Sequence, residues 1–357
     1  MSIVRIILHT IYSKFYFRVL VSFRIVYLHK KNLQDVFNSY FHDIYQFQDF
    51  LTTTSRINEN FKINKFQNHS FISYIKDIEK NALTNESMKL KKYHIFLKNT
   101  LFKYMKVHKN VYSYRHDKSI YDLAKLHHGN HNFFKTDIKG FFRHITPVLI
   151  LNTLHDNISK LPFDDEIVNY FNNIIDLVTV DAFLPAGYVT SPGISNAVLY
   201  NFDEAMTDYC LKHDICYSRY SDDLIFSSND YRGLEKLPQI VPDILELCFP
   251  KSFQLNQLKT MFFDKTNKVT FLGICILPNG HITVDAHIKE NIRQLLYYYS
   301  HDKEKFSKLL EKRFNNSLAK AYGSLNYVND IDKQFIAKLR KKYGNYIVDK
   351  FLHGVKQ

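Results

Sequence analysis

The stretch Tyr220-Ser221-Asp222-Asp223 places two carboxylates side by side between two short, mostly apolar runs, at residues 215–220 and 224–228. Runs of this length and composition are typical of β-strands, so the four residues are predicted to form the tip of a tight hairpin. Two negative charges held at a strand turn are costly unless they are compensated. A divalent cation with oxygen ligands, Mg²⁺ or Mn²⁺, would compensate them. A solvated Asp-Asp turn is the alternative, and this stretch alone does not decide between the two.

A third carboxylate, Asp137, lies near the end of an apolar run at residues 133–138 that is predicted to be a buried strand. Between the two acidic sites, residues 184–196 contain the signals of a loop that leads into a helix. We expect Ser191 to be the N-cap of that helix and Pro192 to take its first position. Apolar residues then recur at helical spacing. The predicted order is a strand with an Asp, a loop, a capped helix, and the hairpin with its Asp pair.

In that order and spacing the three blocks resemble motifs A, B and C of reverse transcriptases, and the bacterial retron-type and defence-associated (anti-phage) branches are the most similar. Residues 255–260, Leu-Asn-Gln-Leu-Lys-Thr, resemble motif D of the family. Residues 270–274, followed by the turn at 278–280, resemble the hairpin that grips the primer. The resemblance covers residues 111–284 well and the first hundred residues poorly.

The resemblance implies an α/β (α+β) architecture, the right-hand polymerase fold. Residues 1–110 would form an N-terminal helical extension and fingers. Residues 111–284 would form the palm with part of the fingers, a ferredoxin-like antiparallel sheet backed by helices. Residues 285–357 would form a helical thumb. Their helical spacing, with Asp285 as a cap and Gly344 as a stop, agrees with this.

The same resemblance, together with the chemistry, assigns the catalytic and metal-binding residues. Nucleotide addition with two divalent metals needs carboxylates that converge from different strands. Asp137 and Asp222 are expected to bind Mg²⁺ (or Mn²⁺), with Asp223 as a neighbouring acid at the same metal site. The backbone carbonyl of Ile138 is expected to be a further metal ligand. Lys259 is expected to protonate the pyrophosphate leaving group or to neutralise its charge.

Four residues are expected to bind the substrate. Phe142 would be a wall beneath the sugar that excludes a 2′-hydroxyl, although a core role beside Phe141 is the alternative. Ala186 and Gly187 belong to motif B, where Ala186 replaces the usual Gln. Tyr220 would pack under the primer end.

Residues 114–120 resemble the block that precedes motif A in the family. Within it, Arg115 and Lys118 are candidates for contacts with template phosphates. A fingers block with an Arg that clamps the triphosphate is not recognisable in residues 55–110. The retron-type Val-Thr-Gly sequence before the thumb is also altered, at residues 269–273. A divergent, defence-type enzyme therefore agrees better with the sequence than a plain retron enzyme.

The net charge of +13 is unevenly distributed. Residues 1–110 carry 18 Lys and Arg against 7 Asp and Glu, and residues 285–357 carry 15 against 8. Residues 111–284 carry 15 against 20, so the segment with the carboxylates is acidic. Basic flanks around an acidic centre are typical of an enzyme that acts on nucleic acid. A compositional excess of Lys would explain the flanks but not the acidic centre.

Residues 3–28 are largely apolar, but Arg5, Lys14, Arg18 and Arg24 interrupt them. Each such charge at a bilayer centre costs about 2.5–3.5 kcal/mol. No small-residue cleavage site of the secretory kind follows. We therefore expect a basic amphipathic helix and no membrane association.

The chain has four cysteines and no CxxC pair. That pattern predicts reduced thiols in a cytoplasmic protein rather than a disulfide framework or a zinc site.

Together these features predict an RNA-directed DNA polymerase (reverse transcriptase) that uses dNTPs and makes a DNA product. Its RNA template would be a structured non-coding RNA, and its role would be in bacterial antiviral defence. An effector protein, a second polymerase subunit or a second copy of the chain are the expected protein partners. Two alternatives remain: a template-independent or protein-primed polymerase of the same fold, which Ala186 keeps open, and a non-catalytic RNA-binding scaffold.

Overall fold

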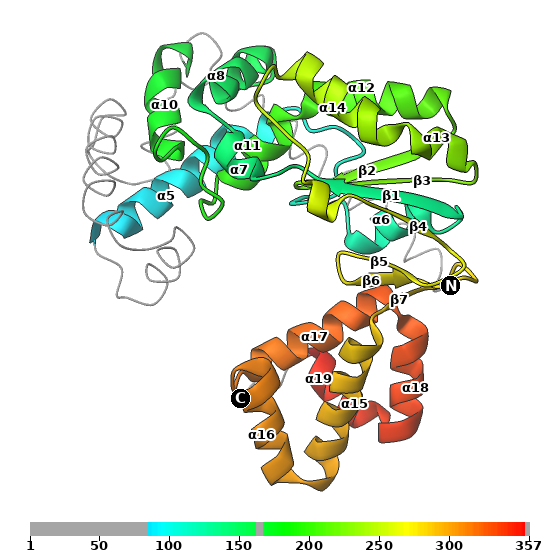
Figure 1. The fold of residues 1–357 in the computed structure, drawn as a ribbon. Coiled ribbons are helices and arrows are strands. Elements are labelled where there is room, and N and C mark those ends of the chain that lie inside the picture. Colours follow the sequence, from blue (N-terminus) through cyan, green and yellow to red (C-terminus); the bar gives the residue numbers. More distant parts are fainter. Residues whose placement is uncertain (1–84, 162–166, 354–357) are drawn as a thin grey trace, which may run out of the picture. The chain divides into compact units, whose positions relative to one another are not determined.

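The computed structural model describes residues 85–161 and 167–353 (Figure 1). The chain divides into two compact units. Of the described residues, the first contains 85–114, 138–161, 167–205 and 244–254, and the second contains 115–137, 206–243 and 255–353. The basic apolar segment at 3–28 and the possible fingers block at 55–84 lie outside the described residues. The division into 1–110, 111–284 and 285–357 stays a prediction.

The described part of the first unit is helical. Its elements are α5 (Asn85–Thr100), η1 (Phe102–Tyr104), α7 (Phe141–His144), α8 (Pro147–Asp156), η2 (Ile158–Lys160), η3 (Val168–Tyr170), α10 (Phe171–Val178) and α11 (Ser191–Val198). The helices α12 (Tyr200–Lys212) and α14 (Leu237–Cys248) each continue from one unit into the other.

The predicted cap of α11 is wrong by one residue. Thr190 is the N-cap, so Ser191 is already the first helical residue and Pro192 the second. The Ser191 hydroxyl instead donates a hydrogen bond of 2.5 Å to the carbonyl of Pro185. A bond inside the preceding loop therefore takes the group that would have capped the helix.

The second unit is built on a four-stranded antiparallel sheet in the order β2-β3-β1-β4. The strands are β1 (Asn132–Asp137), β2 (Cys216–Tyr220), β3 (Asp223–Ser228) and β4 (Met261–Asp264). Helices connect β1 to β2 and β3 to β4, whereas a tight turn connects β2 to β3. This is the strand order of a ferredoxin-like sheet, as predicted.

One aromatic residue from each strand forms a row across one face of this sheet. Tyr217 of β2 stacks on Phe226 of β3 with ring centroids 5.0 Å apart. Phe134 of β1 lies 5.8 Å from Phe226 and 4.8 Å from Phe262 of β4. Tyr231 of α13 (Tyr231–Glu235) then packs on Phe262 at 5.7 Å. Cross-strand aromatic pairs of this kind fix the register of a sheet.

The buried His127, at the end of α6 (Ile120–His127), links the helix to β2 and β3. Its imidazole contacts Ser227 Oγ on β3 at 2.7 Å and Ser218 Oγ on β2 at 2.8 Å. Burial lowers the pKa of His127 to about 3, so the ring is neutral. Ser119 and Asp122 form a reciprocal capping box that begins this helix.

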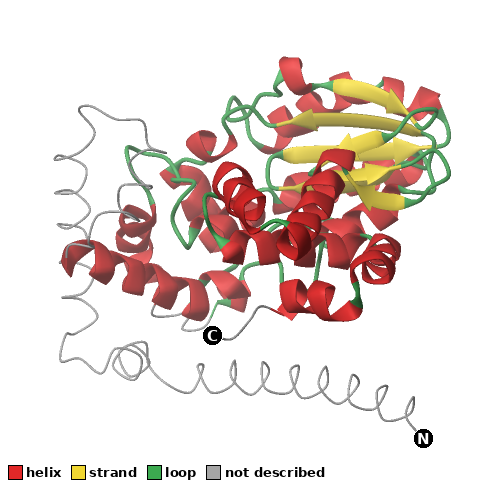
Figure 2. Ribbon diagram, turned by 90° about the horizontal axis from the view of Figure 1, so that it is seen from below, coloured by secondary structure: helices red, strands yellow, loops and turns green. Residues whose placement is uncertain are grey.

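A second sheet has the order β5-β6-β7, with β5 (Val269–Phe271), β6 (Ile274–Ile276) and β7 (Ile282–Val284). The seven strands of the described residues all belong to the second unit and gather together in Figure 2, where they are yellow. The β5–β6 turn, at Leu272 and Gly273, has positive φ angles of 52° and 80°. The predicted hairpin at 270–274 is therefore confirmed.

Five helices follow: α15 (Ala286–His301), α16 (Lys303–Phe314), α17 (Leu318–Ile331), α18 (Lys333–Tyr343) and α19 (Asn345–His353). Asp285 caps α15 by accepting from His287 N at 2.9 Å, and α18 ends at Gly344, with φ 86°. Both predicted helix ends are confirmed. No helix within residues 85–161 or 167–353 is both long enough and apolar enough to cross a bilayer.

Candidate active site

The antiparallel register brings two of the predicted carboxylates together. Asp137 is the last residue of β1 and Asp223 the first of β3, and the two are direct partners in the register. Directly opposed residues on antiparallel strands have Cβ atoms about 4.5–5.5 Å apart. Asp222 precedes Asp223 in the turn. All three acids, the acid cluster, therefore lie at one end of the two central strands, β1 and β3. We call this end of the sheet the acid edge.

The turn itself needs an unusual backbone conformation. Tyr220 and Asp223 are register partners, so Ser221 and Asp222 form a two-residue turn. Ser221 has φ 59°, in the left-handed region. Two-residue hairpin turns need such angles to match the twist of the strands. The guanidinium of Arg219, which is fully buried, donates to the carbonyl of Ser221 at 3.1 Å and supports this conformation.

Asp137 is buried, and its two carboxylate oxygens have different surroundings. Oδ2 accepts a hydrogen bond of 2.6 Å from Nζ of Lys259. Oδ1 is buried and has no hydrogen-bond partner among the described residues. An orphaned anionic oxygen is costly, so a cation is the group it would accept most favourably.

Lys259 reaches this edge because its segment is joined to β1. It ends η4 (Gln257–Lys259), and the backbone N–H of Asn256 donates to the carbonyl of Asp137 at 2.9 Å. Thr136 and Thr260 add a hydroxyl contact of 2.8 Å. The hydrogen bond to Asp137 raises the pKa of Lys259, whose side chain is otherwise 61 % exposed. The ammonium group therefore keeps its proton at neutral pH.

The carboxyl of Asp222 has a raised pKa. Burial raises the pKa of its carboxyl, and the charges of Asp223 and Asp137 raise it further, while Lys259 acts in the opposite direction. Burial and, after it, the neighbouring negative charges therefore disfavour the ionised form of Asp222.

A residue that the sequence did not suggest neutralises the third acid. Nζ of Lys135 lies 2.8 Å from Asp223 Oδ1. Lys135 stands two residues before Asp137 on β1, and its register partner is Ile225, so Asp223 is its diagonal neighbour on the adjacent strand. The alternation of β1 places Lys135 and Asp137 on one face, which was visible in the sequence. That β3, which carries Asp223, lies beside β1 was not visible in the sequence.

The charges and donors of this edge fit a divalent cation by type. Carboxylate oxygens are the ligands of Mg²⁺ and Mn²⁺. One oxygen of Asp137 is orphaned, and burial and the acidic neighbours disfavour the ionised form of Asp222. Within the described part of the chain, however, no three His, Cys, Asp or Glu side chains stand in a metal-ligating arrangement. Lys259 and Lys135 occupy oxygens of Asp137 and Asp223 instead.

The remaining predicted residues are spread over both units. Tyr220 ends β2 and is half-buried, next to the acid turn. Ile138 follows β1 and is fully buried. Arg115 is bound to Asp117 by two contacts, at 2.9 and 2.7 Å, and Lys118 is half-buried.

Phe142, Ala186 and Gly187 belong to the first unit. Phe142 is half-buried on α7 with its ring 5.3 Å from that of Phe141, which is 2 % exposed. Phe141 is thus the core residue of the pair. Ala186 and Gly187 lie in an exposed turn between Pro185 and Tyr188.

The comparison with protein families gives one match, over residues 81–276, to the family described as reverse transcriptase (RNA-dependent DNA polymerase). That segment contains the four-stranded sheet, its β2–β3 turn and all three acids of the cluster. Among curated proteins, the chain is 29% identical over 279 residues to the retron Ec73 reverse transcriptase of Escherichia coli, covering 73% of this chain and 82% of the relative. It is 28% identical over 243 residues to the retron Ec83 reverse transcriptase of the same organism, covering 67% and 74%.

Solved structures give a more distant likeness. A telomerase from Candida albicans aligns with a TM-score of 0.41 at 11% identity, over 75% of this chain and 53% of that one. The foamy viral protease-reverse transcriptase in complex with an RNA/DNA hybrid aligns with a TM-score of 0.30 at 16% identity, over 62% and 27%.

Proposed function

The chain belongs to the reverse transcriptase (RNA-dependent DNA polymerase) family, and from that premise we propose that it copies a structured non-coding RNA into DNA as part of bacterial antiviral defence. RNA-directed DNA polymerase activity follows from the family. The template and the defence role rest on the likeness to retron enzymes and on the basic flanks of the chain.

The acid cluster carries this proposal. Asp137, Asp222 and Asp223 converge on one sheet edge from two strands and a turn, with one buried oxygen unsatisfied. A scaffold that only bound RNA would gain nothing from such a concentration of negative charge, because nucleic acid is itself negative. The cluster needs a cation, which is the requirement of phosphoryl transfer.

Asp137 and Asp222 would hold the metal ions, Mg²⁺ or Mn²⁺, with Asp223 beside them and the carbonyl of Ile138 as a further ligand. When bound, divalent metals stabilise the charge on the attacking and leaving oxygens of an in-line displacement. Lys259 holds a proton close to Asp137 and would supply it, or its charge, to the pyrophosphate that leaves. Lys135 keeps Asp223 in place from the adjacent strand.

On the substrate side, Tyr220 would support the primer end, and Ala186 and Gly187 would lie along the incoming nucleotide. Phe142 would lie beneath its sugar. The half-exposed position of Phe142 beside the buried Phe141 favours this role over a core role. Comparing rATP with dATP incorporation by Phe142→Val, beside its melting curve, tests the assignment: a stably folded variant with unchanged sugar discrimination would rule it out.

The enzyme would work in the cytoplasm. All four cysteines are free thiols in the structure, as a reducing compartment would keep them.

The experiment that tests the proposal is labelled dNTP incorporation on a primed RNA template by Asp137→Asn. We expect a loss of roughly a thousandfold, because a metal-binding carboxylate supplies several kcal/mol of transition-state stabilisation and each 1.4 kcal/mol is about tenfold. The matched control is Asp264→Asn, because Asp264 is an exposed acid on the neighbouring strand β4. Its Oδ1 accepts from the backbone N–H of Thr266, a contact that the side-chain oxygen of Asn can keep. Near-normal synthesis by Asp137→Asn would remove the acid cluster from the mechanism.

A further inference from the structure

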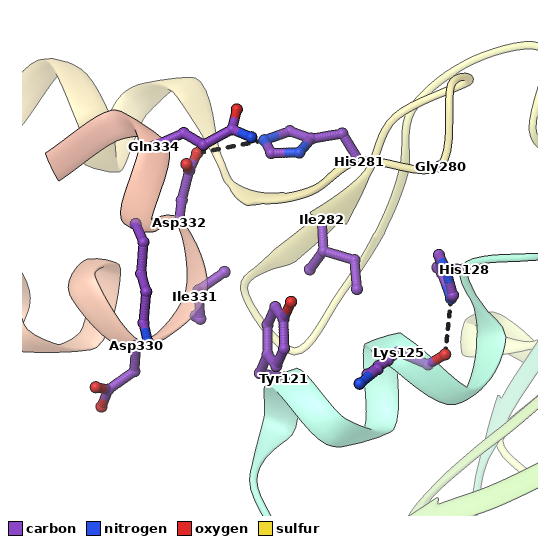
Figure 3. Close-up of a pocket in the computed structure, with 11 residues that line it drawn as sticks. Tyr121, Lys125, His128, Gly280, His281, Ile282, Asp330, Ile331, Asp332 and Gln334 are labelled. Atoms are coloured by element: carbon purple, nitrogen blue, oxygen red, sulfur yellow. Dashed lines mark hydrogen bonds and ion pairs between the residues drawn. The ribbon is translucent and has the colours of Figure 1, made fainter. Parts of the chain in front are cut away.

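A second site lies in the same unit, where α6, the β6–β7 turn and the junction of α17 and α18 meet. They line a half-open cavity of about 530 Å³ (Figure 3). Small-molecule sites have volumes of about 300–1,000 Å³. The polar and aromatic side chains that matter for its chemistry are Tyr121, Lys125, His128, His281, Lys333 and Gln334. None of these elements carries a residue of the acid cluster.

Contacts with residues outside the lining hold the walls of this cavity in place. Asp332, buried at the start of α18, accepts from Thr283 on β7 at 2.5 Å, from Lys289 on α15 at 2.7 Å and from the N–H of Phe335 at 2.9 Å. On the opposite side, the buried Lys265 donates to the carbonyl of His128 at 2.7 Å. The cavity is therefore formed in advance of any ligand.

The β6–β7 turn approaches α6 closely. Gly280 has φ 81°, and a Cβ atom placed on it would lie 3.6 Å from the carbonyl of His128. The turn is closed by a hydrogen bond of 2.8 Å from Gly280 N to Leu277 O. This close approach positions His281 at the rim of the cavity.

The charges that face the cavity are mainly positive and uncompensated. Lys125 and Lys333 form no ion pair with any of the described residues, and both are exposed. Of the two acids in the lining, Asp332 is compensated by Lys289 and contacts His281 Nε2 at 3.8 Å. Only Asp330 remains as an exposed acid. The site therefore favours an anion.

The apolar part of the cavity suits a nucleobase. Tyr121, Ile282 and Ile331 all line the cavity, and Figure 3 shows the Tyr121 ring below Ile282, with Lys125 on the same helix, α6. An aromatic ring flanked by lysines is the combination that binds single-stranded nucleic acid, because the ring stacks on a base and the ammonium groups contact phosphates. The stacking of one base contributes about 1–3 kcal/mol.

From this arrangement we infer that the cavity binds one unstacked nucleotide of a single-stranded nucleic acid, with Tyr121 against its base and Lys125 and Lys333 on the phosphodiesters at either side. The site would hold a strand away from the acid cluster, so it adds to the proposed polymerase function and does not depend on the metal assignments. A single strand is preferred to a duplex because a paired, stacked base has no free face to offer the ring.

The first experiment measures the affinity of the full chain for an oligouridylate of about ten nucleotides, over a series of salt concentrations. Lys125→Glu/Lys333→Glu is expected to bind at least about tenfold more weakly. The neutral Lys125→Gln/Lys333→Gln should reduce the slope of log affinity against log salt by about 1.4, since each phosphate contact contributes about 0.7 for single strands. Lys338→Glu, an exposed lysine on α18 without an ion pair among the described residues, is the matched control and should bind like the wild type.

The second experiment locates the contact. An oligouridylate that contains 5-iodouridine is irradiated with the protein, and the cross-linked peptide is sequenced by mass spectrometry. We expect the cross-link at Tyr121, its loss in Tyr121→Leu, and its persistence in Asp222→Asn. UMP or dTTP competes if the site takes free nucleotides, and duplex RNA competes if it takes paired strands; efficient competition by either would overturn the inference.

Melting curves show whether each variant is folded. A folded Lys125→Gln/Lys333→Gln protein with unchanged affinity and salt slope would contradict the inference, as would cross-links found only outside the Tyr121 peptide. Loss of synthesis in Asp137→Asn is a separate result, so a failure of this site and a failure of the polymerase assignment can be told apart.

Discussion

The acid edge of the four-stranded sheet and the cavity beside α6 use the same residue types in opposite ways. At the edge, Lys259 and Lys135 are each bound to an aspartate, at 2.6 and 2.8 Å, and an excess of negative charge remains. At the cavity, the buried Asp332 is already paired with Lys289, which lies outside the lining, and Lys125 and Lys333 remain among the lining residues. The edge therefore attracts cations and the cavity attracts anions.

This difference explains how one basic protein can both hold a polyanion and perform chemistry on it. Negative charge at the edge would repel nucleic acid unless metal ions compensate it, whereas lysines at the cavity bind phosphates directly. Chemistry and retention of the strand are thereby assigned to different places in the second unit. The following variants test that division.

Of the substitutions that follow, Lys259→Ala is expected to have the largest effect, though a smaller one than Asp137→Asn. Removal of the group that neutralises the leaving pyrophosphate should lower the rate of incorporation by about 100-fold, the lower range for a general acid. Lys268→Ala is the matched control, because Lys268 is also exposed and bound to an aspartate, Asp285, at 2.9 Å. A single-turnover measurement with saturating dNTP gives the rate. Equal rates for both variants would make Lys259 a structural partner of Asp137 only.

A smaller effect is expected for Lys135→Met. Without the ammonium group of Lys135, the negative charge of Asp223 is no longer compensated, and the edge should attract Mg²⁺ more strongly. The half-saturating Mg²⁺ concentration should fall by up to about fivefold, since such a partly exposed pair contributes up to ~1 kcal/mol. Lys139→Met, equally close to Asp137 in sequence but exposed, is the control. An unchanged or higher Mg²⁺ requirement would show that Lys135 does not compete for this charge.

The smallest effect concerns stability. Because burial raises the pKa of Asp222, the folded state binds the proton more tightly than the unfolded state, and stability is lost as pH rises through the raised pKa. Without metal, Asp222→Asn should therefore melt about 1–3 °C higher than the wild type near pH 7 and show little difference near pH 4.

Added Mg²⁺ should reverse the order near pH 7 by stabilising only the wild type. A pH-independent difference in melting temperature, or equal stabilisation of both proteins by Mg²⁺, would contradict the electrostatic account of the cluster.

Much of the acid edge could be predicted from the sequence, because its signals are local. The apolar runs around Asp222, the strand that ends in Asp137 and the turn residues all follow from short-range patterns. The contacts of Lys135 and His127 could not be predicted, because they depend on which strands are neighbours and in what register. A sequence shows the face of a strand but not the strand beside it.

The same limit applies to the wrong helix cap and to the cavity. Ser191 had the right residue type for a cap, but a loop carbonyl took its hydroxyl. The cavity joins α6 to a turn and a helix junction more than 150 residues further along the chain. Lys333 appeared in the sequence only as part of the basic excess of residues 285–357, and Lys125 lies in the acidic central segment, so their common environment needed the structure.

The division between the two sites is tested most directly by measuring RNA affinity and DNA synthesis on the same four proteins: the wild type, Asp222→Asn, Lys125→Glu/Lys333→Glu and the combined variant. We predict that Asp222→Asn loses synthesis and keeps the affinity of the wild type. The lysine substitutions should lower affinity by the same factor in both backgrounds. If Asp222→Asn still synthesised DNA, or if the loss of affinity from the lysine substitutions vanished in its background, the division of labour between the acid edge and the cavity would be contradicted.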